Sequence, residues 1–570
     1  MATKVVEQCQ VAPSSGAPTE QLLKLLHMDM VFLLGPSAVK ILLFYKFHCS
    51  ESHFMDTIVP NLKNSLSLTL KHFPPMAGKI FIDNKNSGMP VSHYVAGQDS
   101  VSLTIAVSHA DFVNLTGCHP REAAQFHGFA PHLNDTLSPT SKLSALAVQL
   151  TLFPNQGVCI GITGNHAIGD GDTLVHFMKT WALINKSNGD DSHLLLASGE
   201  ECLPFYDRDL VRDGYRRAME CWRDITTRPP PSITFSSTFS LHNRTFQGTF
   251  VLSEPEIQKL KNLVIAAKAI VRVSSFVVVC AHLWTCLAKS AAAAVEEVGD
   301  DEPDYFCFPV NCRGLLNPPL PDNYFGNCTK LVTTESTYGK LRGEEGFIAA
   351  AEVISAAVEK TVGNGRGTID GSSKFFLGFV ERLEEMVGKR MLVVGGSPRL
   401  DLYGTDFGWG RAIKFESLSG DNSFGVVFLS NSREYRGGVE IGVSMPRVKM
   451  EAFATSFNQG LAEATEKLRT SSSSITAQNP VVRLLDSENL VVKDANDDDP
   501  LNILWQSFNY PSDSILPRMK FSWNCLCHLD VYVSSWKNNN LKTLHVIAIL
   551  QIVKKKREKQ ENLAEVEKKS

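Results

Sequence analysis

The chain has little excess charge of either sign. Its 570 residues contain 56 Lys and Arg against 60 Asp and Glu, a formal net charge of -4. Such a balance argues against a nucleic-acid surface, which needs clustered basic residues. Uninterrupted apolar runs are also missing, because the most apolar long window, Leu263–Ala288, contains Lys268, Arg272 and His282. We interpret this window as buried core, and we expect neither a nucleic-acid nor a membrane partner.

Cysteine motifs are absent as well. The 13 cysteines are scattered without a CxxC pair, and the one-residue gap between Cys525 and Cys527 suits neither a zinc knuckle nor a redox motif. We therefore expect no metal, and free thiols in a reducing compartment. The segment Met1–Gly16 has no apolar core of the secretory type. These observations predict a cytoplasmic protein, which we expect to be a monomer.

The composition that remains, 43% hydrophobic and 20% charged, is typical of a globular protein with a large core. Alternating and helical patterns occur in both halves of the chain. We expect strands at 41–47, 101–107, 245–252 and 439–445, and helices at 58–70, from 256, at 274–289, at 349–362 and at 449–468. Strands and helices mixed in this way predict an α/β fold in which two layered halves meet at a cleft.

Composition also predicts the domain boundaries. An N-terminal domain at 1–190 is followed by a crossover at 191–232, which ends near the triple proline 229–231 because proline continues neither a helix nor a central strand. A second domain is expected at 233–470. The serine run 471–474 then begins an extension at 471–570 that has the composition of a linker, an irregular segment and a charged tail.

One stretch combines a strand, a turn and a helix around a histidine. Val158–Thr163 is typical of a buried strand, and an apolar stripe at helical spacing begins at Leu174. His166 lies on the turn between them, and Asp170 lies near the helix start. A histidine held on such a turn can act as a general base. The HxxxD pattern alone is weak evidence, because Asp170 could be no more than a helix N-cap.

The rest of the chain adds a set of motifs in a fixed order. His166–Gly171 resembles the HxxxDG motif of the plant BAHD acyltransferases, and Asp406–Gly410 resembles their second signature, DFGWG. Tyr324–Cys328 resembles a motif of the branch that acylates anthocyanins and other phenolic glycosides. Further matches lie at Leu203–Arg208 and Val310–Arg313. The resemblance covers about residues 15–470 and implies two domains related to chloramphenicol acetyltransferase with a channel between them.

The resemblance implies a reaction between an alcohol and an acyl-CoA, a co-substrate, with no bound cofactor. His166 would take the hydroxyl proton as the oxygen attacks the thioester, and would return it to the CoA thiolate. No acyl-enzyme is needed, so no activated Ser or Cys is required. Asp170 is expected to orient the site through a salt bridge, with Arg313 as its candidate partner.

The second signature is expected to contribute to the site too. The indole N–H of Trp409 would stabilise the tetrahedral oxyanion, although a glycine-flanked tryptophan often only packs a loop. Asp406 is included with the candidate catalytic residues, but we expect it to hold its loop near the CoA channel. Gly171 and Gly408 are expected to support the backbone of the two motifs.

The motifs determine the substrates less closely than they determine the reaction. The Tyr324–Cys328 motif favours a sugar hydroxyl of a phenolic or flavonoid glycoside as acceptor, with malonyl-CoA the leading donor; hydroxycinnamoyl and aliphatic donors stay open. One departure from the family concerns Leu26–Met30, which keeps the aspartate Asp29 but lacks the usual aromatic residues around it. We expect this change to alter the acceptor pocket.

The extension resembles a second family. Residues 478–538 contain pieces of the bulb-type lectin domain of S-locus receptor-like kinases, at 489–491, 504–508 and 510–513. The mannose-binding pattern QxDxNxVxY is broken, because Leu485, Ser487 and Lys493 replace Gln, Asp and Tyr. A fused gene fragment is the simplest interpretation. A carbohydrate-binding protein and a catalytically silent family member are the alternatives.

Overall fold

The chain folds into two compact units, Met1–Leu468 and Arg469–Ser570. The computed structural model describes residues 3–33, 38–83, 88–133, 141–192, 203–227, 245–268, 273–293, 298–362, 382, 385–386, 389–418, 425–472, 480–484, 490–494, 505–506, 520–521 and 531–532. The first unit contains every candidate site residue.

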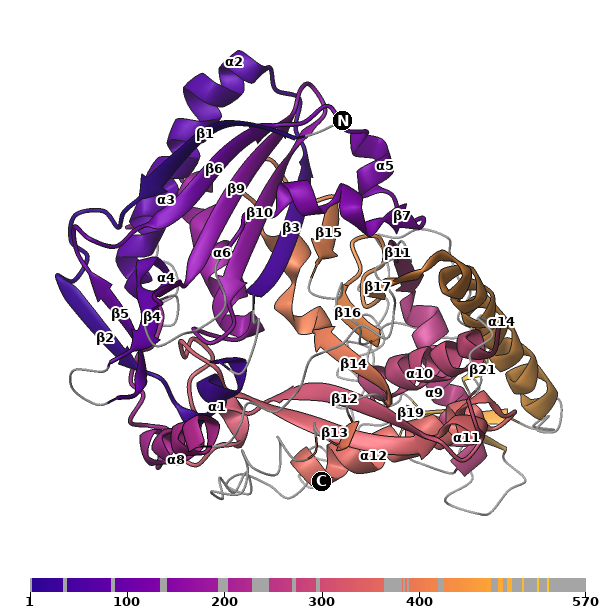
Figure 1. The fold of residues 1–570 in the computed structure, drawn as a ribbon. Coiled ribbons are helices and arrows are strands. Elements are labelled where there is room, and N and C mark those ends of the chain that lie inside the picture. The colour runs from indigo at the N-terminus through magenta and orange to yellow at the C-terminus, as the bar shows by residue number, and fades with distance from the viewer. Residues whose placement is uncertain are drawn as a thin grey trace, which may run out of the picture. The chain divides into compact units, whose positions relative to one another are not determined.

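A six-stranded sheet forms the first half of this unit (Figure 1). Its order is β1(Lys4–Val11), β6(Val101–Val107), β9(Leu146–Phe153), β10(Gly157–Asn165), β3(Ala38–Lys46) and β15(Lys414–Ser417). Every residue of β9 and β10 is buried, so these strands are apolar or small at nearly every position rather than alternating. Helices α3(Val59–His72) and α6(Gly171–Lys186) pack together and share a hydrophobic core with the sheet.

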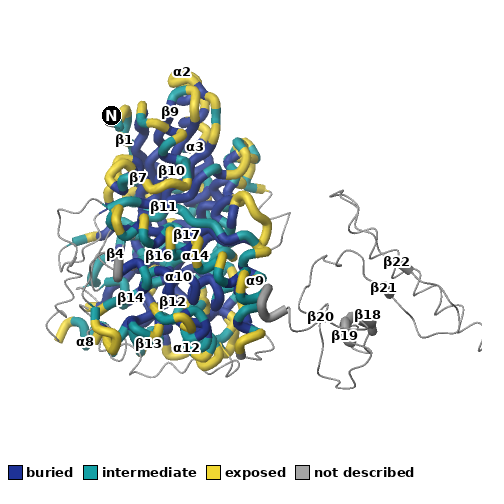
Figure 2. The backbone as a smooth tube through the Cα atoms, turned by 90° about the vertical axis from the view of Figure 1, so that its right-hand side faces the viewer, coloured by how far each residue is buried: buried dark blue, intermediate teal, exposed yellow. Residues whose placement is uncertain are grey.

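A seven-stranded sheet forms the second half. Its order is β13(Thr329–Thr337), β12(Pro303–Asn311), β14(Arg390–Gly396), β16(Gly425–Asn431), β17(Val439–Pro446), β11(Thr245–Leu252) and β7(Arg121–Glu122). A separate core joins this sheet to α9(Glu254–Lys268), α10(Ser275–Ala293), α11(Tyr338–Arg342), α12(Gly346–Val362) and α14(Arg447–Ser472). In Figure 2 the dark blue of buried residues runs along β9 and β10 in one half and along α10 in the other.

The two halves exchange edge strands. Strand β15 comes late in the chain but pairs with β3 of the first sheet, and β7 comes early but pairs with β11 of the second. Arg121 on β7 and Glu416 on β15 form an ion pair of 2.8 Å with both side chains buried. Each sheet therefore has an edge closed by the other half's segment, which hides that edge from other chains.

The remaining elements are short. A four-stranded sheet has the order β2(Glu20–Lys24), β5(Pro90–Val95), β4(Lys79–Ile82) and β8(Leu143–Ser144). Helix α1(His27–Met30), followed by the 3-10 turn η1(Val31–Leu33), packs against α8(Gly214–Thr227). Other short helices in the described part of this unit are α2(Glu51–His53), η2(Phe54–Ile58), α4(Pro74–Ala77), α5(Phe112–Thr116), η3(Ala123–Gln125), η4(His127–Phe129), η6(Arg313–Leu315), η7(Pro398–Leu400) and η8(Leu402–Gly404).

The second unit contributes two small sheets in its described parts. One has the order β18(Pro480–Leu484), β19(Leu490–Asp494) and β20(Trp505–Gln506), and the other pairs β21(Lys520–Phe521) with β22(Val531–Tyr532).

The predicted α/β class is confirmed, and β6 and β11 have the bounds expected from their alternation. The closing helix is longer than expected, because α14 begins at Arg447 and ends at Ser472, inside the serine run. The expected crossover contains the helix α8, whereas its triple proline lies outside the described residues. The boundaries 1–190, 191–232 and 233–470 stay a prediction.

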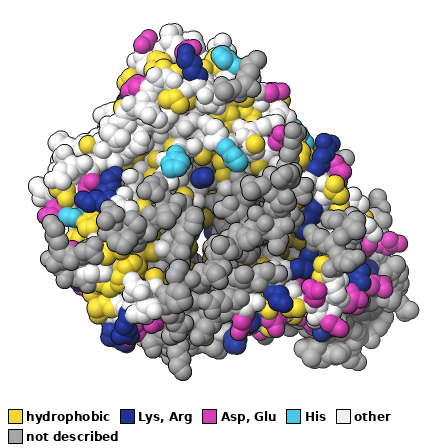
Figure 3. Space-filling view, viewed as in Figure 1, with side chains coloured by type: hydrophobic (Ala, Val, Ile, Leu, Met, Phe, Trp, Pro, Cys, Tyr) yellow, Lys and Arg dark blue, Asp and Glu magenta, His cyan; other side chains and the backbone are white. Residues whose placement is uncertain are grey.

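Acidic and basic side chains are interspersed over the described surface seen in Figure 3. This arrangement agrees with the nearly balanced charge of the sequence.

Candidate active site

His166 lies on the turn between β10 and α6. Strand β10 ends at Asn165, whose side-chain Oδ1 accepts a hydrogen bond of 3.0 Å from the Ala167 N–H. Asp170 is the N-cap of α6, and its carboxylate accepts the Thr173 N–H at 3.2 Å. A Cβ on Gly169 would lie 2.6 Å from the Thr173 side chain, so this turn requires glycine there. The shape of the turn therefore depends on the N-cap at Asp170 and on the close contact between Gly169 and Thr173.

The imidazole of His166 is half-buried and stacked. Phe32 lies parallel to it, with ring centroids 3.7 Å apart and an interplanar angle of 10°. The main-chain carbonyl of His166 accepts a hydrogen bond of 2.8 Å from Asn327 Nδ2. Burial lowers the pKa of His166 below 6.5, although Asp170 and Asp29 pull it upward. At neutral pH the imidazole is thus uncharged, the form that accepts a proton.

Asp170 is paired with Arg313, as expected. The guanidinium donates to both carboxylate oxygens, at 2.8 Å and 2.9 Å, and the Cys328 N–H donates a further bond of 3.0 Å. Burial opposes ionisation of Asp170, but Arg313 and the backbone donors outweigh it and lower the carboxyl pKa below 3.8. Asp170 is therefore a buried anion, fully occupied by its partners, and holds the turn rather than exchanging protons.

A cavity of about 1650 Å³ opens beside His166. It is lined by residues of both halves, among them His166, Asp172 and Gly171 from the first and Asn311 and Phe276 from the second. Four arginines with exposed side chains also line it: Arg399, Arg411, Arg433 and Arg436. This cavity has the position expected for the predicted channel and is large enough for two organic substrates.

The second signature lies away from this cavity. Asp406 Oδ1 accepts the N–H groups of Gly408 and Gly410, at 2.9 Å and 2.8 Å, and Oδ2 pairs with Lys186 at 2.7 Å. Lys186 is the last residue of α6, a helix of 16 residues that spans about 24 Å from its Asp170 end. Gly408 has a φ of +100°, which explains the glycine of the motif. Asp406 therefore holds its own loop, the structural role expected for it.

Trp409 does not reach the histidine. Its ring packs against Phe47, Tyr45 and Phe407, with centroids 5.1, 5.6 and 5.9 Å away, and it is not among the residues that line the His166 cavity. The structure thus separates Trp409 from His166 by roughly the length of α6. The oxyanion role of Trp409 stays a prediction, and it would require the indole N–H to lie within hydrogen-bonding distance of the reacting oxygen.

Four site residues were not assigned from the sequence: Phe32, Asp29, Arg208 and Asn327. Arg208 Nη1 donates to Asp29 Oδ2 at 3.0 Å, and Asn327 Nδ2 donates to Asp29 Oδ1 at 2.8 Å. Three signals pointed toward them. Asp29 is the aspartate kept in Leu26–Met30, Arg208 ends the matched segment Leu203–Arg208, and Asn327 belongs to the motif at Tyr324–Cys328. None of these signals specifies contacts across some 300 residues of chain.

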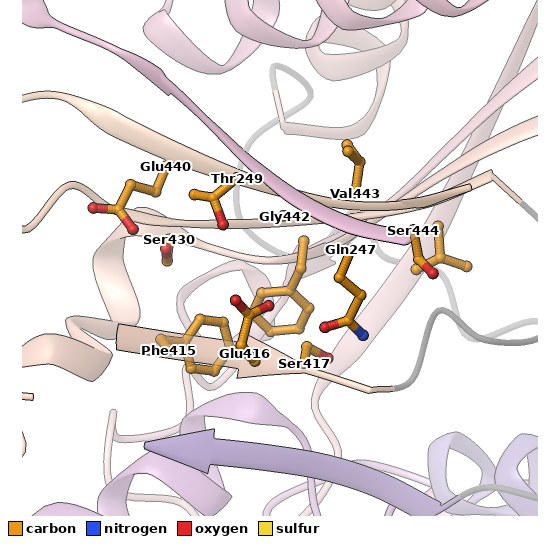
Figure 4. A pocket seen from close by; sticks show the side chains of 12 residues that line it. Gln247, Thr249, Phe415, Glu416, Ser417, Ser430, Glu440, Gly442, Val443 and Ser444 are labelled. Carbon is orange, nitrogen blue, oxygen red and sulfur yellow. The ribbon is translucent and has the colours of Figure 1, made fainter. Parts of the chain in front are cut away.

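A much smaller cavity of about 30 Å³ lies at the exchanged strands (Figure 4). Gln247, Glu416 and Ser417 group around it, and the described residues offer no hydrogen-bond partner to the Gln247 amide or the Ser417 hydroxyl. Its size suits about one water molecule, which these polar groups would bind, and is too small for a substrate.

Within the described residues, no group of His, Cys, Asp and Glu side chains is arranged to hold a metal ion. The helices in those ranges are also too short or too polar to cross a membrane.

The profile of the Transferase family matches residues 1–459, most of the chain. The chain belongs to this family. The predicted resemblance to BAHD acyltransferases is therefore confirmed, and the chain is an acyl-CoA-dependent acyltransferase. A second profile, D-mannose binding lectin, matches residues 456–537, which confirms the resemblance of the extension.

Curated members of the transferase family align over nearly their whole length. Phenolic glucoside malonyltransferase 1 of Nicotiana tabacum is 40% identical over 80% of this chain and 99% of its own. Malonyl-coenzyme:anthocyanin 5-O-glucoside-6'''-O-malonyltransferase of Salvia splendens is 35% identical over 82% of this chain and 98% of its own. Among solved structures, vinorine synthase matches with a TM-score of 0.56 at 22% identity, covering 79% of this chain and 96% of its own. This last likeness supports the fold.

Proposed function

We propose that the chain transfers an acyl group from an acyl-CoA to a sugar hydroxyl of a phenolic or flavonoid glycoside, with His166 as the general base. One observation carries the proposal: an uncharged, half-buried imidazole lies at the wall of a cavity that both halves line. An alcohol needs a proton acceptor beside it to become a good nucleophile at neutral pH.

The proposed reaction moves one proton twice. His166 takes the proton from the acceptor hydroxyl while the oxygen bonds to the thioester carbonyl carbon. When the tetrahedral intermediate collapses, the carbon–sulfur bond breaks and the imidazolium returns the proton to the CoA thiolate. Asp170, held by Arg313, keeps the turn in place and exchanges no proton in this scheme.

The charges of the cavity support a CoA ester as donor. Arg399, Arg411, Arg433 and Arg436 place exposed guanidinium groups along it, and such groups bind phosphate oxygens through paired hydrogen bonds. Malonyl is the leading acyl group, because malonyltransferases are the relatives with the highest identities quoted above. Hydroxycinnamoyl is the second candidate, since a coumaroyl-CoA:anthocyanidin 3-O-glucoside-6''-O-coumaroyltransferase of Arabidopsis thaliana is 32% identical.

The walls of the cavity support an aromatic acceptor. Phe32, Met76 and Phe276 line it beside aliphatic residues, a lining suited to the ring system of an aglycone. The aglycone would pack there while a sugar hydroxyl faces His166.

The test is transfer by the purified full chain. Malonyl-CoA, coumaroyl-CoA and acetyl-CoA are each supplied with simple phenolic glucosides and an anthocyanin glucoside. Mass spectrometry identifies the product, and a thiol reagent follows release of CoA. We expect one new ester per acceptor sugar, fastest with malonyl-CoA. Acylation of amines or free aliphatic alcohols alone would overturn the acceptor assignment, and release of CoA without an ester would overturn the transfer itself.

We further propose a cytoplasmic, monomeric enzyme. The ten cysteines that lie in the described residues are all unpaired thiols, as in a reducing compartment. Gel filtration with light scattering tests the monomer, and a mass of twice 62.8 kDa would contradict it.

The lectin profile favours a second candidate function, carbohydrate binding by residues 456–537. The broken mannose pattern, with Lys493 on β19 in place of Tyr, argues against it. Retention of the full chain on immobilised mannose, and its release by free mannose, would support binding. Passage without delay would exclude mannose as the ligand.

A further inference from the structure

Asp29 is the second buried carboxylate near the histidine. Its side chain is fully buried, and it accepts hydrogen bonds from the Leu26 N–H at 2.7 Å, Arg208 Nη1 at 3.0 Å and Asn327 Nδ2 at 2.8 Å. These donors come from three separate segments of the chain. Asp29 thus fastens the helix α1 to residues that lie about 180 and 300 positions further along.

Asn327 uses both hydrogens of its amide group. One hydrogen bond of 2.8 Å goes to Asp29 Oδ1 and the other, also of 2.8 Å, goes to the main-chain carbonyl of His166. Both neighbours are acceptors, so the NH₂ of the amide must face them. A carboxylate at this position would only accept, and an aliphatic side chain would do neither. Only a two-hydrogen donor of this size satisfies both groups.

The same short segment also holds the imidazole ring. Phe32 follows Asp29 by three residues and lies flat against His166 at 3.7 Å. Fixing Asp29 therefore fixes the ring that covers one face of the imidazole. His166 is held at its carbonyl by Asn327 and at its ring by Phe32, and both depend on Asp29.

The neighbours of Asn327 are held by the first half as well. The Gly326 N–H donates to Thr173 Oγ1 at 3.1 Å, and the Cys328 N–H donates to Asp170 Oδ2 at 3.0 Å. The carboxylate of Asp170 thus bonds to this segment and not to the imidazole. Within the segment, the Asn327 amide is the group that bonds to His166.

We propose that Asn327 is the positioning residue of the general base, and that Asp29 and Phe32 complete its support. The proposal rests on the proposed role of His166 as general base and adds the residues that hold its side chain in position. A reacting group displaced by about 1 Å can lose about 100-fold in rate, so a support of this kind acts on turnover rather than on substrate affinity.

The test compares two variants that remove the donors in different ways. Asn327→Asp keeps the shape and adds a negative charge, whereas Asn327→Leu keeps the approximate size and stays neutral. We expect both to lower kcat by about 10- to 100-fold while the KM for the acyl-CoA changes less than about 3-fold. A loss in Asn327→Asp alone would assign the effect to charge and overturn the proposal.

Asn185→Leu is the matched control. Asn185 Nδ2 donates to the Phe407 main-chain carbonyl at 2.8 Å, so it is also an amide that joins distant parts of the chain. It lies at the far end of α6, about 20 Å from the turn that carries His166. We expect its kcat to stay within about 3-fold of the parent even if its melting temperature falls. An equal loss of kcat would show that any weakened bridge has this effect, which contradicts a specific role for Asn327.

A titration separates this proposal from the proposed function. Uniform labelling of histidine at Cε1 with ¹³C, with His166→Gln used to assign the signal, follows the His166 imidazole without any substrate. The charged groups that act on its pKa are Asp170 and Asp29, each paired with an arginine, and Asp172 lines the same cavity. We expect Asn327→Leu to lower the midpoint of this titration, because the Asn327 side chain raises the pKa of His166 and a leucine does not.

Phe32→Leu is the variant expected to fold in every case, since Phe32 is only half-buried. Water would then reach the imidazole more easily, so we expect its midpoint to rise toward 6.5. If both variants show unchanged titrations and normal kcat, Asn327 and Phe32 do not position His166. If the parent chain is inactive but the titrations shift, the proposed function is refuted and the positioning of His166 is not.

Discussion

Asp170→Asn tests the strongest ion pair of the site. The asparagine has the shape of the aspartate but no charge, so Arg313 loses the carboxylate that it contacts at 2.8 Å and 2.9 Å. Asp170 is only 3% exposed, so water cannot replace that partner. Removing one partner of a buried pair costs about 3–5 kcal/mol, because the other charge is left uncompensated. Asp172 Oδ2 lies 3.6 Å from Arg313 and compensates in part, so the lower end, about 3 kcal/mol, is expected here.

The melting temperature gives the readout. Unfolding entropy of about 2.1 cal/mol/K per residue, summed over the 468 residues of the first unit, makes about 1 kcal/mol per kelvin. The expected fall is therefore about 3 °C by differential scanning calorimetry at pH 7. Activity should fall too, because Asp170 holds the segment that contains Asn327.

Asp300→Asn is the control. Asp300 also pairs with an arginine, Arg342, at 2.7 Å, but its side chain is 62% exposed. Exposed pairs contribute about 0–1 kcal/mol, so the expected fall is below about 1 °C. If Asp170→Asn melts within 1 °C of the parent, the ion pair does not stabilise the fold. Arg313→Met combined with Asp170→Asn should recover part of the loss, since no charge is then left unpaired.

Three further predictions concern the histidine and the extension. His166→Ala should abolish transfer in the product assay while its circular dichroism and melting stay near those of the parent; retained activity in a folded variant would remove His166 from the reaction. Burial lowers the pKa of His166, so the acid limb of the kcat/KM profile should lie below pH 6.5, and a limb above 6.5 would contradict the assignment. The free energy of unfolding should also fall as the pH drops below 6.5, because the unfolded histidine binds a proton there and the folded one does not. Deleting residues 475–570 should preserve turnover, because every candidate site residue lies in the first unit; loss of activity or unfolding would show that the extension belongs to the enzyme.

The sequence predicts the positions of strands, helices and turns better than the contacts between distant residues. Strand β11 and the turn at His166 follow from local patterns, since alternation, glycine and an N-cap act within a few residues. The family motif even led to the pair of Asp170 with Arg313. Trp409 shows the limit of that reasoning, because a shared motif says nothing of where its loop lies, and here a whole helix separates it from His166.

The contacts of Asp29 were beyond such reasoning for a related reason. A charge in an apolar segment indicates that some partner exists, because an unpaired buried charge is costly. It does not say which of many arginines or amides provides the partner. Arg208 and Asn327 are brought there by the packing of distant segments, which no local pattern records.

The strand exchange delays completion of the first sheet during synthesis, because the ribosome makes the chain from its N-terminus. Lys414 to Ser417 pair with Phe44 to Ile41, so the first sheet stays incomplete until about 250 residues after β10 have been made. At about 5–20 residues per second this interval lasts roughly 12–50 s. During it the edge of β3 has no partner and can pair with other chains. The nascent first half is thus the aggregation-prone species, and expression conditions that protect it, such as slower initiation or chaperone supply, should raise the yield of folded enzyme.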